Sequence, residues 1–334
     1  MEWLISLIQS HPGATDLHLT AGYPVFLRQE GRLAPSPVPS DACWDSLFAL
    51  LSAEERARWE RGGASDSSFS AGSFRCRLHL YRAGGAPAAA IRLLPALSAL
   101  PPDRDQQWIE ETAMAPAGLA LITGPTGSGK STTLARLIGT ILLRRPCHIV
   151  TIEDPVEYLF SREGALVHQR EVGRDTSSFA SGIREALRED PDVIAIGELR
   201  DQETMSAALT ASETGHLVLA TMHTHRAIQA VSRITHTFPA EKEGEIRRIL
   251  ASVLLTISAQ TLQRLPRPLL IREILVNTPA IAHLIQEGRD REILSYMEMG
   301  GGAMRTLRQD LTGAARREGL SPEIAAALRK SILS

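Results

Sequence analysis

The sequence predicts an α/β protein in which a small α+β domain precedes a larger domain with a sheet covered by helices. Two observations support this. Beyond residue 109, apolar runs alternate with helical stretches. The apolar runs read as strands and lie at residues 119–123, 148–152, 193–196 and 217–221. Between the first of these runs and the helix after it lies a glycine-rich loop, GPTGSGKST. Because sheets of this kind bind ligands at the carboxyl ends of their strands, the loop marks the expected functional edge.

The first hundred residues have a different rhythm. An amphipathic helix is expected over residues 3–11 and a second helix over 45–61, with a proline-rich loop between them at 34–39. Alternating polar and apolar residues predict strands, at residues 15–20, 25–28, 68–82 and 88–94. The Pro101-Pro102 pair and the charges after it indicate a linker. The expected organisation is therefore a domain over 1–99, a linker over 100–108 and a second domain over 109–334, whose portion from residue 240 onward is expected to be mostly helical.

Composition excludes several classes of protein. The chain has 334 residues, a formal net charge of −2 and three scattered cysteines. The charge argues against a broad electrostatic grip on nucleic acid. Cysteines without Cys-x-x-Cys spacing cannot form a four-thiolate zinc site, and they favour reduced thiols over a disulfide framework. No apolar run approaches a membrane span and no signal peptide is evident, so we expect a cytoplasmic protein.

The glycine-rich loop fits the phosphate-binding pattern G-x-x-x-x-G-K-[ST] in its required context of strand, loop and helix. Its residues are Gly124, Pro125, Thr126, Gly127, Ser128, Gly129, Lys130, Ser131 and Thr132. Backbone N–H groups are expected to surround phosphate oxygens, and the helix N-terminus adds partial positive charge. Lys130 should reach the β- and γ-phosphates of ATP, and Ser131 should hold Mg²⁺. The alternative is a glycine-rich turn that only caps a helix, which would not require lysine followed by a hydroxyl.

Carboxylates follow two of the predicted strands. Glu153, Asp154 and Glu157 come after the run at 148–152, where a magnesium–nucleotide complex would relieve their mutual repulsion. One of them can activate the attacking water. Glu198 follows the run at 193–196 and is expected to hold Mg²⁺ through water, although Asp is the usual residue there. The alternatives are an acidic solvent-facing turn and a helix-initiating acid.

Histidines and arginines complete the candidate set. His216 and His223 flank the run at 217–221 and could sense the γ-phosphate, or could be ordinary loop and cap histidines. Arg77 and Arg92 lie on predicted strands of the first domain. They could reach the nucleotide of a neighbouring subunit in a ring, or could belong to a solvated strand face. Spacing alone does not decide between these alternatives.

Several segments together resemble the secretion ATPases of the PilT/GspE superfamily, and most closely its PilT-like, pilus-retraction branch. The resemblance begins at residues 15–22 and extends past 278–281, with motifs at 123–133, 151–158, 169–172, 186–192, 197–201 and 214–218. It implies a PAS-like N-terminal domain, a RecA-like ATPase domain and a homohexameric ring that uses ATP and Mg²⁺.

The resemblance also implies residue roles. Glu157 would be the water-activating glutamate and Glu198 the atypical Walker B acid. His216 and His223 would form the histidine box, and Arg77 and Arg92 would complete the site of a neighbour. The partner would be an inner-membrane pilus platform protein, met at the cytoplasmic face of that membrane, without direct contact to nucleic acid.

One segment departs from the family pattern. Retraction members carry Ala-Ile-Arg-Asn-Leu-Ile-Arg-Glu, whereas residues 280–287 here read AIAHLIQE, with Ala282 and His283 in place of Arg-Asn. The leading interpretation is an ATP-hydrolysing motor that drives pilus retraction. The altered segment keeps a second interpretation open, a nucleotide-gated assembly or regulatory module with little turnover. A nucleic-acid translocase is a third, which the net charge disfavours.

Overall fold

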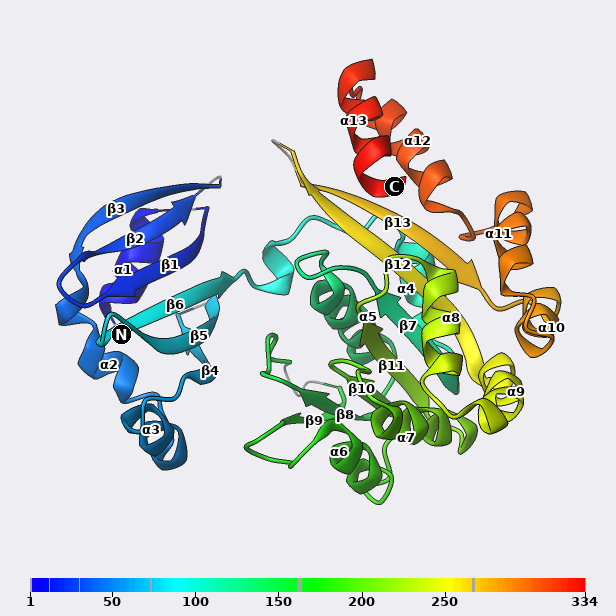
Figure 1. The fold of residues 1–334 in the computed structure, drawn as a ribbon, viewed down its shortest axis with the longest axis horizontal. Helices are drawn as coiled ribbons and strands as arrows, with labels where there is room; N and C mark the ends of the chain where they lie inside the picture. The colour runs from blue at the N-terminus through cyan, green and yellow to red at the C-terminus, as the bar shows by residue number, and fades with distance from the viewer. Residues whose placement is uncertain are drawn as a thin grey trace. The chain divides into compact units, whose positions relative to one another are not determined.

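A computed structural model describes residues 2–11, 13–29, 31–72, 74–160, 164–265 and 268–333. The chain divides into two compact units, each described separately below (Figure 1). The first comprises Met1–Pro101 together with Pro155–Leu159, and the second comprises Pro102–Asp154 and Phe160–Ser334. Each unit contains a sheet and helices, so the α/β prediction is confirmed.

The described residues of the first unit form a six-stranded antiparallel sheet in the order β3-β2-β1-β6-β5-β4. The strands are β1 (Ala14–Thr20), β2 (Pro24–Gln29), β3 (Arg32–Pro39), β4 (Ser65–Ala71), β5 (Phe74–Ala83) and β6 (Ala86–Leu94). The helices are α1 (Glu2–Ser10), α2 (Trp44–Phe48) and α3 (Ala53–Glu60), with short 3-10 turns η1 (Ser40–Ala42) and η2 (Leu97–Ala99).

Strand alternation explains the core of the first unit. Leu17 and Leu19 of β1 are buried, while Asp16 and His18, which alternate with them, face the other side of the sheet. The buried face packs against α1 and α2 through one apolar cluster, which includes Leu4, Leu7, Ile8, Trp44, Leu47, Cys76, Leu78 and Leu80. The opposite face carries polar and charged side chains, among them Asp16, His18, Arg77 and Arg92, beside a few apolar ones.

Three expectations for this unit are wrong. Residues 68–82 were expected to form one strand, yet they are divided between β4 and β5, which pair antiparallel. Residues 34–39 were expected to be a loop, yet they belong to β3. This strand lies at the edge of the sheet, where proline costs no ladder hydrogen bond on the open side. Residues 45–61 form two helices rather than one. The break occurs because Ser52 caps α3, with its hydroxyl accepting from the N–H of Glu55 and the Glu55 carboxylate accepting from the N–H of Ser52.

The described residues of the second unit form a seven-stranded sheet in the order β13-β12-β7-β11-β10-β8-β9. Neighbouring strands are parallel except for the pair β12 and β13. The strands are β7 (Gly118–Thr123), β8 (His148–Glu153), β9 (Leu166–Glu171), β10 (Val193–Ile196), β11 (Leu217–Met222), β12 (Leu254–Arg264) and β13 (Pro268–Val276).

Helices cover both faces of this sheet, as the continuous apolar strands require. Helices α4 (Gln106–Ala113) and α5 (Lys130–Arg144) pack on the face that carries Ala120 and Ile122. The opposite face, with Leu119 and Leu121, packs against α6 (Phe179–Ala186), α7 (Gln202–Glu213), α8 (Ala227–His236), α9 (Glu243–Val253), α10 (Pro279–Gln286) and α11 (Asp290–Met299). A short turn, η3 (Ala240–Lys242), precedes α9.

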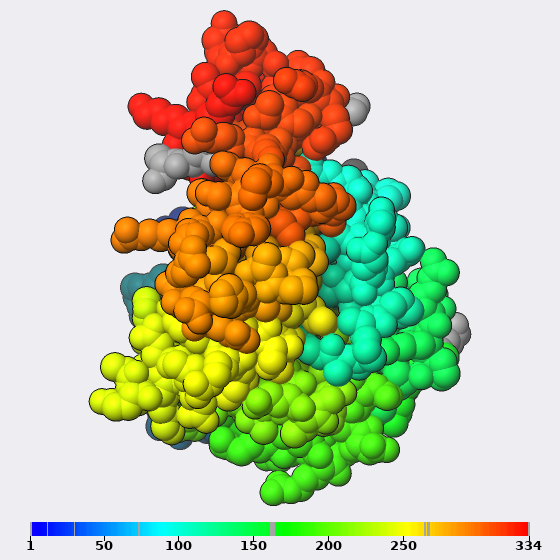
Figure 2. Space-filling view, turned by 90° about the vertical axis from the view of Figure 1, so that its right-hand side faces the viewer, coloured from blue at the N-terminus to red at the C-terminus, as the bar shows by residue number. Residues whose placement is uncertain are grey.

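The C-terminal helices α12 (Leu307–Arg317) and α13 (Pro322–Leu333) pack on β13 in a smaller apolar cluster. On the face shown in Figure 2, the segment from α9 to α13 forms a continuous surface, coloured yellow to red. No helix of the described residues is both long enough and apolar enough to cross a bilayer.

The predicted linker over residues 100–108 is only partly outside the second unit. The division between units falls between Pro101 and Pro102, and α4 begins at Gln106. The side chains of Asp103 and Asp105 are only 4% and 11% exposed, because both form ion pairs with Arg272 of β13. The proline pair and the charges after it indicated a linker, and nothing local in the sequence indicated the distant arginine that pairs with these carboxylates.

Candidate nucleotide site

The P-loop leaves the buried strand β7 and enters α5 through positions that only glycine tolerates well. Gly124, Gly127 and Gly129 have φ values of 150°, 77° and 86°. A Cβ atom on Gly124 would lie 2.2 Å from the carbonyl oxygen of Gln260 in β12. The loop therefore passes directly against a neighbouring strand, which fixes its path.

Lys130, the first residue of α5, folds back over the loop. Its Nζ donates to the carbonyl oxygens of Gly124 at 2.8 Å and Pro125 at 3.1 Å. The hydroxyl oxygen of Ser128 is buried and, within the described part of the chain, has no hydrogen-bond partner. A cation, an unused polar group and the N-terminus of a fifteen-residue helix thus converge at one place. This is the arrangement that binds phosphate in P-loop proteins.

Gln260 of β12 supports the loop, and the sequence analysis missed it. Its Nε2 donates to the carbonyl oxygen of Ser128 at 2.8 Å, and its Oε1 accepts from the hydroxyl of Thr133 at 3.0 Å. The side chain is 1% exposed in a strand of mostly buried residues. A buried amide needs partners, so the polar residue in an apolar strand was the available signal.

Glu198 and His223 lie together at the carboxyl edge of the sheet. Glu198 follows β10 and is 8% exposed, while His223 follows β11. One carboxylate oxygen, Oε2, lies 3.0 Å from Nε2 of His223, and the other lies 2.5 Å from the guanidinium of Arg200. The end of β7 is tied to the same edge, since Thr123 Oγ1 donates to the carbonyl oxygen of Thr224 at 2.5 Å. The P-loop, Glu198 and His223 therefore share one edge.

The acidic segment after β8 is divided between the two units. Glu153 ends β8 in the second unit and accepts hydrogen bonds from Thr151 and Gln169. Glu157 belongs with the first unit, where the neighbouring Val156 carbonyl accepts from Arg75 Nε at 3.2 Å. The water-activating role of Glu157 stays a prediction.

His216 does not join His223, and the expectation that both sense one phosphate is wrong within a single subunit. His216 precedes β11, whereas His223 follows it, so a six-residue strand of about 20 Å separates them. The Nδ1 atom of His216 lies 3.0 Å from the carbonyl oxygen of Ala211, and its carbonyl accepts from the N–H of Gly118. It stabilises the amino edge of the sheet, which is the loop-histidine alternative.

Arg77 and Arg92 face each other on the polar side of the first unit's sheet, as a directly paired couple on β5 and β6. Their side chains are 39% and 57% exposed, and they form ion pairs with Asp66 at 3.8 Å and Asp16 at 3.0 Å. Partial burial alone would raise the pKa of Asp16, but hydrogen bonds from Thr15 and Arg92 outweigh it and lower that pKa. Both arginines can reach outward from this face.

The described residues contain no group of three or more His, Cys, Asp and Glu side chains arranged to hold a metal ion by themselves.

Known proteins are similar to this chain in both sequence and fold. A family model described as Type II/IV secretion system protein matches residues 94–268. The uncharacterized protein YggR of Escherichia coli is 40% identical over 307 residues, which cover 90% of this chain and 93% of YggR. The type IV pilus retractation ATPase PilT of Pseudomonas aeruginosa is 37% identical over 319 residues, covering 93% of both chains. The crystal structure of the pilus retraction motor PilT with bound ADP superimposes with a TM-score of 0.84 at 38% identity, covering 96% of this chain and 95% of that one.

Proposed function

Because the chain belongs to the Type II/IV secretion system protein family and is a PilT-like secretion ATPase, we propose that it is the motor that withdraws a type IV pilus. The observation that carries this proposal is the shared edge of the P-loop, Glu198 and His223. Likeness to the pilus retraction motor over nearly the full length of both chains supports the direction of movement.

The second unit supplies the groups that ATP requires. Lys130 would meet the β- and γ-phosphates in place of the loop carbonyls it now caps. Ser131 and Glu198 offer the oxygen ligands that Mg²⁺ prefers, Glu198 through water. The magnesium ion would neutralise phosphate charge. His223 fixes the second oxygen of Glu198 and so orients the carboxylate.

Groups of the first unit would complete the reaction. Glu157 would take the proton of the attacking water, while Arg77 and Arg92 of an adjacent subunit would stabilise the charge that develops on the phosphate. Each nucleotide would then lie between two subunits of a homohexamer. Hydrolysis would open and close these interfaces in turn, which converts phosphate chemistry into movement.

The partner would be a pilus platform protein in the inner membrane, and the ring would work at the cytoplasmic face of that membrane. The family likeness supports this placement. A net charge of −2 argues against direct contact with nucleic acid.

Glu157→Gln tests the catalytic assignment. The variant should bind ATP as the parent does, and its steady-state phosphate release should fall about a hundredfold or more, because the general base is lost. Glu318→Gln, an exposed change at the end of α12, is the control and should retain parental turnover. Parental turnover by Glu157→Gln would refute the role.

Deletion of the gene, with pili counted by microscopy and twitching scored, tests the direction of work. Excess pili with lost twitching support retraction. Loss of pili would contradict it and would indicate extension.

One observation favours a second candidate, a nucleotide-gated regulatory module. The exposed side of α10 carries His283 and Gln286, with Ala282 half-buried beside them, where retraction members have arginines at two of these positions. Tight ATP binding with turnover near background, and unchanged pilus number in the deletion strain, would favour this module over a motor.

A further inference from the structure

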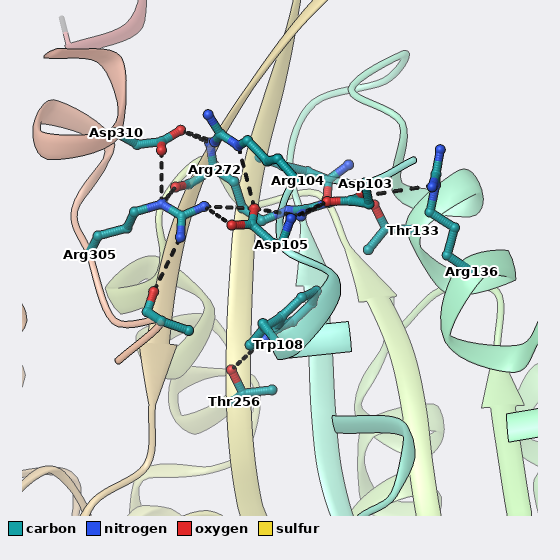
Figure 3. Close-up of polar contacts among 12 residues, drawn as sticks. Asp103, Arg104, Asp105, Trp108, Thr133, Arg136, Thr256, Arg272, Arg305 and Asp310 are labelled. Carbon is teal, nitrogen blue, oxygen red and sulfur yellow. Dashed lines mark hydrogen bonds and ion pairs between the residues drawn. The ribbon is translucent and has the colours of Figure 1, made fainter. Parts of the chain in front are cut away.

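Arg272 in the middle of β13 is a fully buried cation, with a side chain that is 0% exposed. Its Nη1 donates to Asp103 Oδ1 and Asp105 Oδ2, both at 2.8 Å, and its Nη2 donates to Asp103 Oδ2 at 3.0 Å (Figure 3). Arg305 adds a second guanidinium, 2.7 Å from Asp105 Oδ2. A buried guanidinium is tolerated only when carboxylates and hydrogen bonds satisfy it, so this cluster is held in one geometry.

The charges in the cluster are firmly fixed. Burial alone would raise the pKa of Asp103 and of Asp105, but the guanidinium groups beside them outweigh burial and lower both pKa values. The carboxylates therefore remain ionised, and the cluster stays a network of charges at any pH near neutrality.

On one side the cluster reaches the P-loop. Arg272 Nη2 also donates to Thr133 Oγ1 at 3.0 Å, in the first turn of α5. The same hydroxyl donates to Gln260 Oε1, and Gln260 Nε2 donates to the carbonyl oxygen of Ser128. A continuous chain of hydrogen bonds thus runs from the buried arginine to the phosphate-binding loop.

On the other side the cluster reaches α12. The Asp310 carboxylate, 3% exposed, accepts from the backbone N–H of Arg272 at 2.8 Å and lies 2.8 Å from Arg305 Nε. Arg104 also pairs with Asp310 (Figure 3). Because Asp310 lies in the first turn of α12, this helix is attached to β13, the strand whose Arg272 also contacts Thr133 in the first turn of α5.

We propose that Arg272 and Thr133 are positioning residues that couple nucleotide occupancy of the P-loop to helix α12 and to residues 102–105. A shift of the first turn of α5 displaces the Thr133 hydroxyl, and Arg272 transmits that shift to Asp103, Asp105 and Asp310. By thermodynamic linkage, the state of α12 then changes nucleotide affinity by the same factor. The inference rests on the proposed nucleotide site.

The contacts in this chain are hydrogen bonds between polar groups. A variant that removes a hydroxyl can therefore be distinguished from one that only disturbs packing. Thr133→Val keeps the shape of the side chain and removes the hydroxyl, so it cuts the contacts to Arg272 and Gln260 at one point. Thr133→Ser retains the hydroxyl. A purely structural role predicts equal or larger damage from Thr133→Ser, which loses a methyl group, whereas coupling predicts damage only from Thr133→Val.

The first measurement is ADP affinity by calorimetry. Thr133→Val should bind ADP about tenfold more weakly than the parent, a moderate value for coupling between sites, and Thr133→Ser should bind within about twofold of it. Thr235→Val is the matched control, since among the described residues the hydroxyl of this buried threonine of α8 donates to the carbonyl oxygen of Ser232 in its own helix. It should bind ADP as the parent does.

The second measurement is hydrogen exchange of the α12 amides with and without ADP. ADP should slow this exchange in the parent and in Thr133→Ser, and the effect should be lost in Thr133→Val. Asp310→Asn should also weaken ADP binding. In the double variant with Thr133→Val, the loss of ADP affinity should be smaller than the product of the two single losses, because both changes interrupt the same chain of contacts.

Parental ADP affinity in Thr133→Val, together with an unchanged α12 response, would overturn the coupling. Failure of the parent protein to bind ADP would instead overturn the proposed function, and the coupling with it.

Discussion

At the scale of single residues, the P-loop shows two kinds of constraint. Lys130 and Ser131 follow from local sequence, because strand, loop and helix are consecutive in the chain. Gln260 does not, because it acts on the loop from more than a hundred residues away. The separation of His216 from His223 could have been predicted locally, since the two histidines precede and follow one strand.

Gly124 is subject to both kinds of constraint, since it belongs to the local loop pattern and also lies against the backbone of the distant Gln260. Gly124→Ala tests the second constraint. The added Cβ would collide with the Gln260 backbone, which cannot rotate away as a side chain can. We expect nucleotide binding to fall about a hundredfold, as the P-loop is pushed off its path. Gly127→Ala is the control, since its Cβ meets nothing within 4 Å and only its positive φ adds strain of about 1 kcal/mol. Equal loss in the two variants would contradict this account.

At the scale of elements, the four strands whose ends carry the candidate site residues were predicted, whereas β9 was not, and neither were the long strands β12 and β13, which lie in a part of the chain that was expected to be mostly helical. The edge strand β3 was hidden by its prolines, and the break before α3 depends on one capping serine. Residues 102–105 are the clearest case. The proline pair and the charges indicated a linker, and only the fold brings Arg272 to Asp103 and Asp105.

Asp103→Asn tests the contribution of this segment to stability. The change weakens the pairing of a buried guanidinium and should lower the free energy of unfolding of the second unit by about 3 kcal/mol at pH 7. Urea unfolding measures this. Asp45→Asn, at an exposed position of the first unit, should change it little.

The stabilisation by Asp103 and Asp105 should be lost at acidic pH. The folded-state pKa values of Asp103 and Asp105 lie below the ordinary 3.8. Their stabilisation is therefore fully present above that value and is lost as the pH falls through the lower, folded-state pKa values. The parent should lose stability steeply in this acidic window, and Asp103→Asn should lose less there. Parallel curves for the two proteins would refute the assignment.

At the scale of the whole molecule, the fold class and the order of domains were predictable, because the change from an α+β rhythm to alternating strands and helices is visible in the sequence. Assembly is not visible in a single chain. In the proposed ring, the exposed pair Arg77 and Arg92 would contact the nucleotide of a neighbouring subunit.

Mixing of inactive subunits tests the shared site. Subunits with Arg77→Ala and Arg92→Ala should lack ATPase activity, as should subunits with Lys130→Ala. A mixture should regain part of the activity, since an intact P-loop can then face intact arginines of a neighbour. Arg58→Ala, an exposed change on α3, should leave activity intact when present alone. Absence of recovery in the mixture would argue that the arginines act within their own subunit or not at all.

The position of Asp103 and Asp105 determines where the chain can be cut. An ATPase fragment that starts at residue 109, where sequence pattern alone would begin it, discards both carboxylates and leaves the Arg272 guanidinium in the protein interior without them. A fragment that starts at residue 101 retains them. We expect the shorter fragment to be insoluble and the longer one to be recovered folded, so the eight residues 101–108, which lie outside the P-loop pattern, decide whether the ATPase domain of this protein can be studied by itself.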